Sequence, residues 1–241
     1  PDELSIIMSY AERGDLRKLL DTKEVHLNEK QRVKILLQVG EAMDHLHERD
    51  ILHRDLKSLN VLLDHNCDAL VTDFGLSFAK ELATTINRSK PEGGGGSVRW
   101  AAPECLRGDE TFKFERPCDV YSFGILMYEV LTRKLPWCEF QDIQVAAQVL
   151  HNRRPKLPPI GCDRSFDTLR AGGVWKVLES AWHADPAQRL TFTELVAELK
   201  RVDEDLKFHS LGRVEWPVTP NAPVMETFSP DSPDSYIDSS S

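Results

Sequence analysis

Two short segments constrain this chain more than any other feature of its sequence. The first runs from His53 to Asn60 and reads His-Arg-Asp-Leu-Lys-Ser-Leu-Asn. The second, Asp73 to Gly75, reads Asp-Phe-Gly. Each segment alone is a weak signal, because runs of a few residues recur by chance. Together they agree with one pattern in order, in spacing and in the apolar residues between them, so chance does not account for the pair.

The polar residues of these segments suit the transfer of a phosphoryl group. That chemistry needs an acceptor hydroxyl held in line and cations that neutralise phosphate charge. Asp55 can accept or orient the hydroxyl proton, and Lys57 can place a positive charge on the transferred phosphate. Asn60 and Asp73 offer the hard oxygen ligands that Mg²⁺ prefers. All four residues are therefore candidates for catalysis, and Asn60 and Asp73 are the candidate metal ligands.

With these motifs the chain resembles the protein kinase family, whose signatures include H-R-D-L-x-x-x-N and D-F-G. The resemblance covers about residues 4–206. It implies a mainly α fold, the large C-terminal lobe of a kinase with a small β-hairpin, plus one remnant strand and the hinge of the small lobe. It also implies ATP and Mg²⁺ as cofactors and a protein as substrate. The expected parts are a small-lobe remnant over 1–14, a large lobe over 15–206 and a disordered acidic tail, rich in Ser and Pro, over 207–241.

The resemblance assigns the first residues to the nucleotide. Leu4–Tyr10 is mostly apolar and β-like, which predicts a buried strand. Met8 would then be the gatekeeper of the nucleotide pocket. The backbone of the hinge, at Ser9, Tyr10 and Ala11, would hydrogen-bond adenine.

Two further candidates for the nucleotide site have ordinary structural explanations as well. Asp15 could reach the ribose, and it is equally suited to cap a short helix over 15–20; the two roles are compatible. Leu62 occupies the position that packs beneath adenine in the family. The sequence by itself predicts only that Leu62 is a core residue.

Local patterns predict the elements on either side of the H-R-D loop. Asn28 with Gln31 has the pattern of a capping box, and the apolar residues that follow recur at helical spacing. Val61–Leu63 and Ala69–Val71 are short apolar runs around a polar gap, which predicts a hairpin. This hairpin would hold the motif asparagine and the D-F-G aspartate on opposite sides of one site.

The run Cys118–Leu131 is apolar nearly all round, which predicts a helix in the middle of the domain. Asp119 near its start would be buried and would need hydrogen-bond donors. In kinases this residue bonds the backbone of the H-R-D loop; the alternative is an acid favoured by the helix dipole. Further helices are predicted over 144–150, over 174–182 and from a Thr191–Glu194 cap to near Leu206.

Residues 76–97 are polar and include four consecutive glycines, which predicts a long loop that is costly to order. Ala102-Pro103-Glu104 resembles the A-P-E motif that closes a kinase activation segment. Ser97 takes the place of the hydroxyl residue that contacts the catalytic aspartate and lysine, where the family usually has Thr. The resemblance also implies an ion pair between Glu104 and Arg189, because a bidentate guanidinium suits such a tie.

Two kinase signatures are missing from these 241 residues. There is neither a G-x-G-x-x-G loop to cover the phosphates nor a V-A-I-K strand with its lysine. We therefore expect the chain alone to be weakly active or inactive, as a fragment of a longer protein or as a truncated product.

The sequence favours one substrate specificity without excluding others. Lys57 in the catalytic loop favours transfer to Ser or Thr, while Arg99-Trp100 and Asp119–Gly124 resemble the tyrosine-kinase-like group of Ser/Thr kinases. Two alternatives stay open: a non-catalytic binding module, and a tyrosine or dual-specificity kinase.

Composition excludes other classes of function. The net charge of −9 argues against a general role in binding nucleic acid or membrane surfaces, and no apolar run is long enough to span a bilayer. The five cysteines are scattered, without a C-x-x-C pair. This pattern predicts a reduced, cytoplasmic setting and no zinc site.

Overall fold

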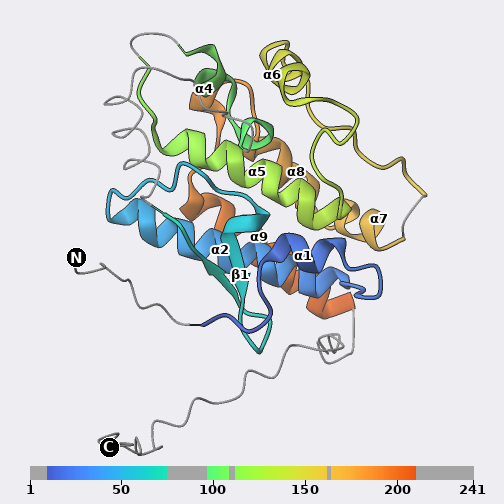
Figure 1. Cartoon of the computed structure of the whole chain (residues 1–241). Helices are drawn as coiled ribbons and strands as arrows, with labels where there is room; N and C mark the ends of the chain where they lie inside the picture. The colour runs from blue at the N-terminus through green and yellow to red at the C-terminus, as the bar shows by residue number, and fades with distance from the viewer. Residues whose placement is uncertain (1–9, 75–96, 109–111, 162–163, 210–241) are drawn as a thin grey trace, which may run out of the picture.

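The computed structural model describes residues 10–74, 97–108, 112–161 and 164–209, which form a mainly helical body with one small sheet (Figure 1). The helices are α1 (Leu16–Asp21), α2 (Glu29–Glu48), α4 (Pro103–Arg107), α5 (Arg116–Thr132), α6 (Asp142–Leu150), α7 (Arg164–Ala171), α8 (Val174–Ala181) and α9 (Phe192–His209). Short 3-10 helices are η1 (Ser58–Asn60), η2 (Val98–Trp100) and η3 (Pro186–Gln188). The strands β1 (Val61–Leu63) and β2 (Ala69–Val71) form the antiparallel hairpin that the sequence predicts.

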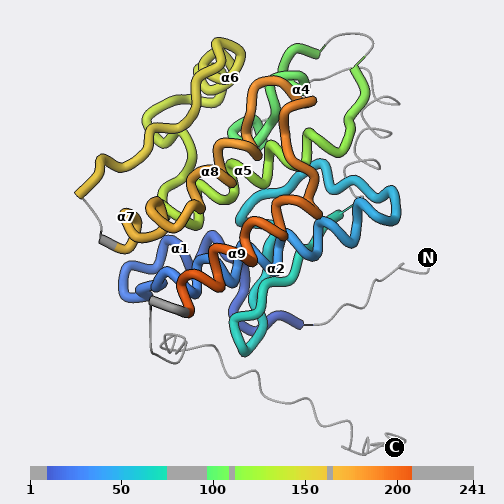
Figure 2. Tube along the Cα trace, turned by 180° about the vertical axis from the view of Figure 1, so that it is seen from behind, coloured from blue at the N-terminus to red at the C-terminus, as the bar shows by residue number. Residues whose placement is uncertain are grey.

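Helix α5 lies at the centre of this body, with α2 and α8 packed against it (Figure 1). Every residue from Cys118 to Leu131 is buried, which confirms the helix predicted from its apolar sequence. Figure 2, which views the molecule from behind, shows α9 lying along α2. The core is therefore helix-on-helix, and α5 offers buried side chains to several elements at once.

Gly124 allows α8 to approach α5 closely. A Cβ at this position would lie 3.0 Å from the backbone nitrogen and from the Cβ of Trp182. A neighbouring backbone cannot give way as the end of a flexible side chain can, so any side chain here would push the two helices apart.

We expect Gly124→Ala to destabilise the protein. Overpacking costs about 1–3 kcal/mol, which exceeds the gain of about 1 kcal/mol that Ala brings to a helix interior. The measurement is a urea melt. Gly172→Ala is the matched control, because a Cβ there would meet its nearest atom at an ordinary 3.4 Å. Equal midpoints for the two variants would contradict the close approach.

Both predicted helix caps at the start of the chain are present. Asp15 caps α1, with its side chain accepting from the backbone nitrogen of Lys18 at 2.9 Å. Asn28 and Gln31 form the reciprocal capping box of α2. These caps fix where each helix begins, because they satisfy backbone N–H groups that have no partner within the helix.

The structure also contains elements that the sequence did not predict. Helix α4 has only five residues, with Pro103 at its start and Gly108 in the left-handed conformation at its end. Helix α7 buries Phe166 and Leu169. Smaller differences concern bounds: α6 begins at Asp142 rather than at residue 144, α8 ends at Ala181 rather than Trp182, and α9 runs on to His209.

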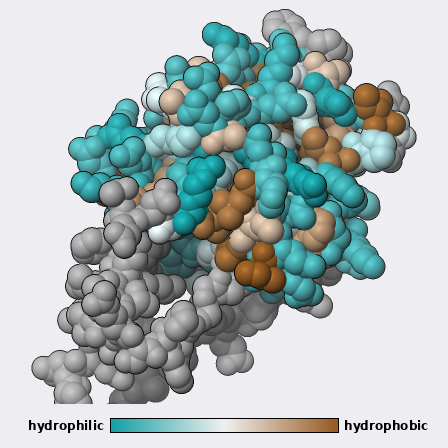
Figure 3. Space-filling model, turned by 90° about the horizontal axis from the view of Figure 1, so that it is seen from above, coloured by the Kyte–Doolittle hydropathy of each residue, from teal (hydrophilic) through white to brown (hydrophobic). Residues whose placement is uncertain are grey.

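None of the described helices combines the length and the apolar character needed to cross a membrane. The face seen from above carries mostly hydrophilic side chains, with small hydrophobic patches between them (Figure 3).

Candidate active site

A buried carboxylate at the start of α5 holds the H-R-D loop. Asp119 has no exposed surface and accepts from the backbone nitrogens of His53 at 2.9 Å and Arg54 at 2.8 Å. The Nε2 atom of His47 on α2 lies 3.0 Å from the same carboxylate. This arrangement confirms the expected bond between Asp119 and the loop backbone, and it satisfies a buried charge that would otherwise be very costly.

Four of the candidate catalytic residues meet beyond this anchor. Lys57 Nζ lies 2.9 and 2.8 Å from the two carboxylate oxygens of Asp55 and 3.1 Å from Ser97 Oγ. The Ser97 hydroxyl donates to Asp55 Oδ1 at 2.5 Å. Asn60 Nδ2 donates to the Asp55 backbone oxygen at 2.7 Å and to its Oδ2 at 3.1 Å. Residues up to 42 positions apart in the chain thus share one carboxylate.

These contacts set the charge of Asp55. Burial by itself raises the pKa of this carboxyl. Hydrogen bonds from Lys57, Ser97 and Asn60 outweigh burial and hold the pKa below its ordinary value of 3.8. Asp55 is therefore ionised at neutral pH and can accept a hydrogen bond from an incoming hydroxyl.

The candidate metal ligands lie at the end of the hairpin. The backbone nitrogen of Thr72 donates to the backbone oxygen of Asn60 at 3.0 Å, so the residue before Asp73 is held against Asn60. Asp73 itself is exposed and has a φ of 62°. The amide nitrogen of Asn60 is engaged by Asp55, which leaves its oxygen as the atom to offer a cation.

This donor set fits Mg²⁺. An amide oxygen and a carboxylate are hard ligands, and Mg²⁺ sites commonly use one or two carboxylates with water and phosphate oxygens in the other positions. Within the described ranges, no three His, Cys, Asp or Glu side chains gather as a metal cluster. A magnesium ion at Asn60 and Asp73 would take water and phosphate oxygens in its other positions.

The candidates for nucleotide binding are only partly described. Met8 and Ser9 lie outside the described residues, Tyr10 is largely exposed, and the Ala11 backbone oxygen accepts from Gly14 in a turn.

Asp15 and Leu62, the other two candidates, lie side by side through an isolated β-bridge. Leu62 is half-buried, so it is less enclosed than the core residue that the sequence predicts. Asp15 uses its side chain as a helix cap.

The A-P-E segment is tied to the body by the predicted ion pair. Arg189 donates to Glu104 Oε1 at 2.6 Å and to Oε2 at 2.9 Å, which confirms a bidentate contact. The Arg189 side chain has no exposed surface and also donates to the backbone oxygens of Pro117 and His183. The segment after Ser97 is therefore fixed at its far end.

Sequence reasoning missed two residues that organise the site. Arg99 donates to three backbone oxygens between α5 and α6 and pairs with Asp142, which fixes η2 next to Ser97. Glu129 lies within the run that the sequence marks as apolar, yet it is fully buried and hydrogen-bonded to Ser58. The signal for Glu129 was available: a lone carboxylate within an apolar helix needs partners.

Comparison with known proteins decides the family. Residues 1–199 match the family model described as protein tyrosine and serine/threonine kinase. The chain belongs to this protein kinase family. Protein kinases in general use ATP and a divalent metal ion and act on protein substrates.

Individual relatives cover most of the chain. It is 34% identical over 209 residues to serine/threonine/tyrosine-protein kinase HT1 of Arabidopsis thaliana, covering 86% of this chain and 49% of the relative. It is 34% identical over 200 residues to dual specificity protein kinase pyk3 of Dictyostelium discoideum, covering 83% and 14%. It is 32% identical over 216 residues to probable serine/threonine-protein kinase SIS8 of Arabidopsis thaliana, covering 88% and 19%. The chain thus spans less than half the length of these relatives.

Proposed function

We propose that this chain carries the catalytic lobe of a Ser/Thr protein kinase, which transfers the γ-phosphate of ATP to Ser or Thr side chains of proteins. The observation that supports this most is the position of Lys57 Nζ, within 3.1 Å of both Asp55 and Ser97. A carboxylate, a cation and a hydroxyl are thereby held together where an acceptor hydroxyl would have to lie.

Each residue has a distinct part in this proposal. Asp55 accepts the hydrogen bond of the acceptor hydroxyl and orients it, and its lowered pKa keeps it ionised for this role. Lys57 supplies positive charge to the transferred phosphoryl group. Ser97 and Asn60 hold Asp55 in place from two sides. Asn60 and Asp73 would hold Mg²⁺, which when bound neutralises phosphate charge.

The nucleotide would lie against the hinge side of the lobe. We propose that the backbone around Met8, Ser9 and Tyr10 meets adenine, that Asp15 meets the ribose and that Leu62 packs beneath the base. The bridge that places Asp15 beside Leu62 supports this assignment, because one ligand could then touch both residues.

We further propose membership in the tyrosine-kinase-like group and a cytoplasmic location. Arg99-Trp100 and the start of α5 support the group. The cysteines Cys67, Cys105, Cys118 and Cys138, all free in the described part of the chain, support the location.

Dual specificity is the second candidate. The names of two relatives, pyk3 and HT1, include dual or tyrosine specificity.

A binding module without catalysis is the third candidate function, because these residues contain no G-x-G-x-x-G loop and no V-A-I-K strand. For the same reason we propose that the 241 residues alone transfer phosphate weakly or not at all.

The test is a radiolabelled-ATP assay with Mg²⁺ and peptides that carry Ser, Thr or Tyr. The chain is assayed alone and fused behind the small lobe of a protein kinase. We expect little incorporation by the chain alone, and incorporation by the fusion on Ser and Thr. Label on Tyr as well would favour dual specificity. No label from a folded fusion that binds ATP would favour the binding module.

A further inference from the structure

A groove with a basic lining runs between α2 and α9. Its volume is about 420 Å³. From α2 it is lined by Lys30, Lys34 and Leu37, and from α9 by Lys200 and Lys207. Within each helix these residues lie three, four or seven positions apart, a spacing that places them on one face. The groove is therefore formed by one basic face of each helix.

The lining of this groove is opposite in charge to the chain as a whole. Four of the lining residues are lysines and two are acids, which leaves an excess of two positive charges. The whole chain carries a net charge of −9. A surface with such an excess attracts acidic ligands.

A second groove, between α8 and α9, lacks this excess. Its charged lining residues are two bases and two acids: Lys176, Arg201, Glu198 and Asp205. The two grooves share α9, and Lys200 of the first directly precedes Arg201 of the second. The second groove therefore provides a control surface of balanced charge.

The lysines of the basic groove can change partners at low cost. Three of them form ion pairs in which the lysine side chain is more than a third exposed: Lys34 with Asp68 at 2.6 Å, Lys200 with Glu41 at 2.8 Å and Lys207 with Asp203 at 2.6 Å. Exposed pairs of this kind contribute little to stability. A ligand with several carboxylates can therefore compete for these amines.

This chain itself carries a segment of matching charge after α9. Residues 226–238, the acidic segment, contain no lysine or arginine, and their four acids are Glu226, Asp231, Asp234 and Asp238. Phe228 and Tyr236 lie between these acids. Aromatic rings pack against the ammonium groups and the apolar stems of lysines, so this composition suits the groove.

The attachment of the acidic segment to α9 places it within reach of the groove. Helix α9 ends at His209, and Asp231 follows 22 positions later. An extended chain of that length spans roughly 70 Å, whereas the groove from Lys200 to Lys207 is only about 10 Å long. A segment tethered in this way has an effective concentration on the order of mM, so even a weak contact is populated.

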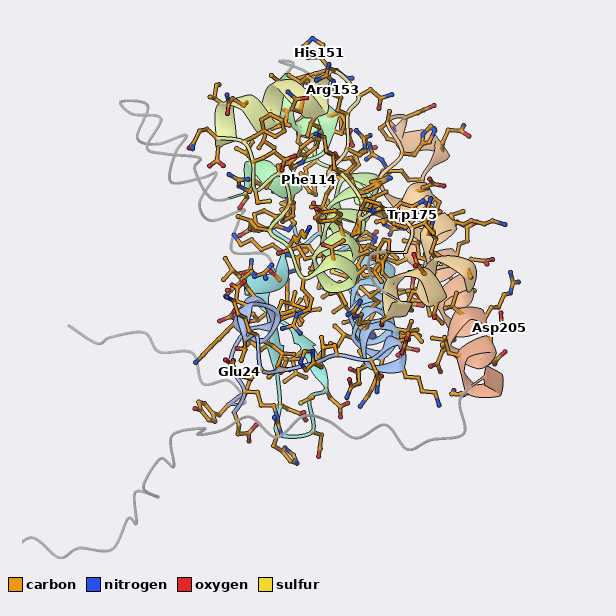
Figure 4. The ribbon with its side chains drawn as sticks, turned by 90° about the vertical axis from the view of Figure 1, so that its right-hand side faces the viewer. Glu24, Phe114, His151, Arg153, Trp175 and Asp205 are labelled. Atoms are coloured by element: carbon orange, nitrogen blue, oxygen red, sulfur yellow. The ribbon has the colours of Figure 1, made fainter. Side chains whose placement is uncertain are left out.

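Another basic surface is less favourably placed. His151 and Arg153 are exposed basic residues just after α6. Figure 4 shows them at the opposite end of the body from Asp205, which lies near the end of α9. The groove between α2 and α9 is therefore the nearer basic surface for a segment that follows α9.

We propose that the acidic segment binds in the groove between α2 and α9 of the same chain. Its carboxylates pair with the groove lysines, and its aromatic rings pack on the lysine stems and on Leu37. The bound segment covers the face of the lobe that these two helices form. This inference goes beyond the proposed function and does not depend on catalysis.

The test is cross-linking of the whole chain with a carbodiimide, which joins a lysine amine to a carboxylate in contact with it as an amide. Peptide mapping by mass spectrometry should find the acids of the segment joined to Lys30 and Lys34. The cross-link between Lys34 and Asp68, which lie 2.6 Å apart, is the internal standard. At 1 M salt, where the screening length is about 3 Å, the segment cross-links should be lost while the body remains folded.

Reversing charge on α9 tests the groove without altering the lysines that are read out. Lys200→Glu combined with Lys207→Glu should lower the yield of segment cross-links to Lys30 and Lys34 about 10-fold, because it replaces two attractions by repulsions. Lys176→Glu combined with Arg201→Glu makes the same change of charge in the second groove. This control should leave the yield unchanged.

A milder pair, Lys200→Ala with Lys207→Ala, serves if the reversed variant does not fold, which circular dichroism checks. An equal loss of yield in the variant and in the control, or the absence of segment cross-links beside a clear internal standard, would overturn the proposal. A mixture of ¹⁵N-labelled and unlabelled chains tests the occupant. Segment cross-links confined to one label support binding within the chain, and links of mixed label would show instead that the groove takes the segment of a second copy.

Discussion

Arg189→Ala should lower the free energy of unfolding by about 3–5 kcal/mol, because it leaves a largely buried carboxylate without its partner. The Arg189 side chain has no exposed surface, and that of Glu104 is 17% exposed. The substitution removes two short contacts to Glu104 and also leaves the backbone oxygens of Pro117 and His183 without this donor. It further removes the guanidinium that lies 5.1 Å from the ring centre of Tyr121.

A urea melt followed by circular dichroism measures this loss. Arg201→Ala is the matched control, because Arg201 forms an ion pair with Glu198 while its side chain is 71% exposed. Exposed pairs of this kind contribute about 0–1 kcal/mol. If the two variants lose stability equally, the Arg189–Glu104 pair does not hold the A-P-E segment as the structure indicates.

The same pair makes the expected loss depend on pH. Burial raises the pKa of Glu104, but the hydrogen bonds and charge of Arg189 hold it below its ordinary 4.5. A lowered pKa in the folded state contributes stability above pH 4.5, which is lost as the pH falls through the folded value. The difference between wild type and Arg189→Ala should therefore shrink below pH 4.5.

The features that the sequence predicted correctly are of two kinds. Some rest on contacts between residues close in the chain, and the others on residues that belong to family motifs. The hairpin follows from two short apolar runs, and the caps of α1 and α2 follow from residues three positions apart. The Glu104–Arg189 pair spans 85 positions and was expected only because both residues belong to family motifs. The position of Ser97 beside Asp55 was expected on the same ground.

Arg133 illustrates what the sequence could not reveal. It ends α5 in the left-handed conformation, with a φ of 59°. Its guanidinium donates to the backbone oxygens of Leu20, Thr22 and Val25, more than 100 positions earlier in the chain. No local pattern marks such contacts, because the acceptors are backbone atoms that every residue carries. The Ser58 hydroxyl that donates to Glu129 lies 71 positions earlier in the chain, and no local pattern links the two residues.

Asp55→Asn should lower phosphotransfer by about 10²–10⁴-fold, the usual contribution of a positioned acid or base. The carboxylate lies within 3.1 Å of donors from Lys57, Ser97 and Asn60. The amide of Asn keeps the shape of the Asp55 side chain but removes its negative charge. It therefore attracts Lys57 less and is a poor acceptor for the proton of the substrate hydroxyl. The loss should therefore appear in kcat rather than in the affinity for ATP.

Initial rates with ATP, Mg²⁺ and a Ser peptide, measured on the small-lobe fusion, provide the test. Asp50→Asn is the control: it lies five residues earlier and pairs with Arg116, but its side chain is 88% exposed. We expect this control to keep its rate, since a surface ion pair contributes little. Both variants should remain folded, which a thermal melt checks. An Asp55→Asn fusion that retains most of its rate would show that this carboxylate does not orient the acceptor, and the assignment of the site to phosphoryl transfer would fall with it.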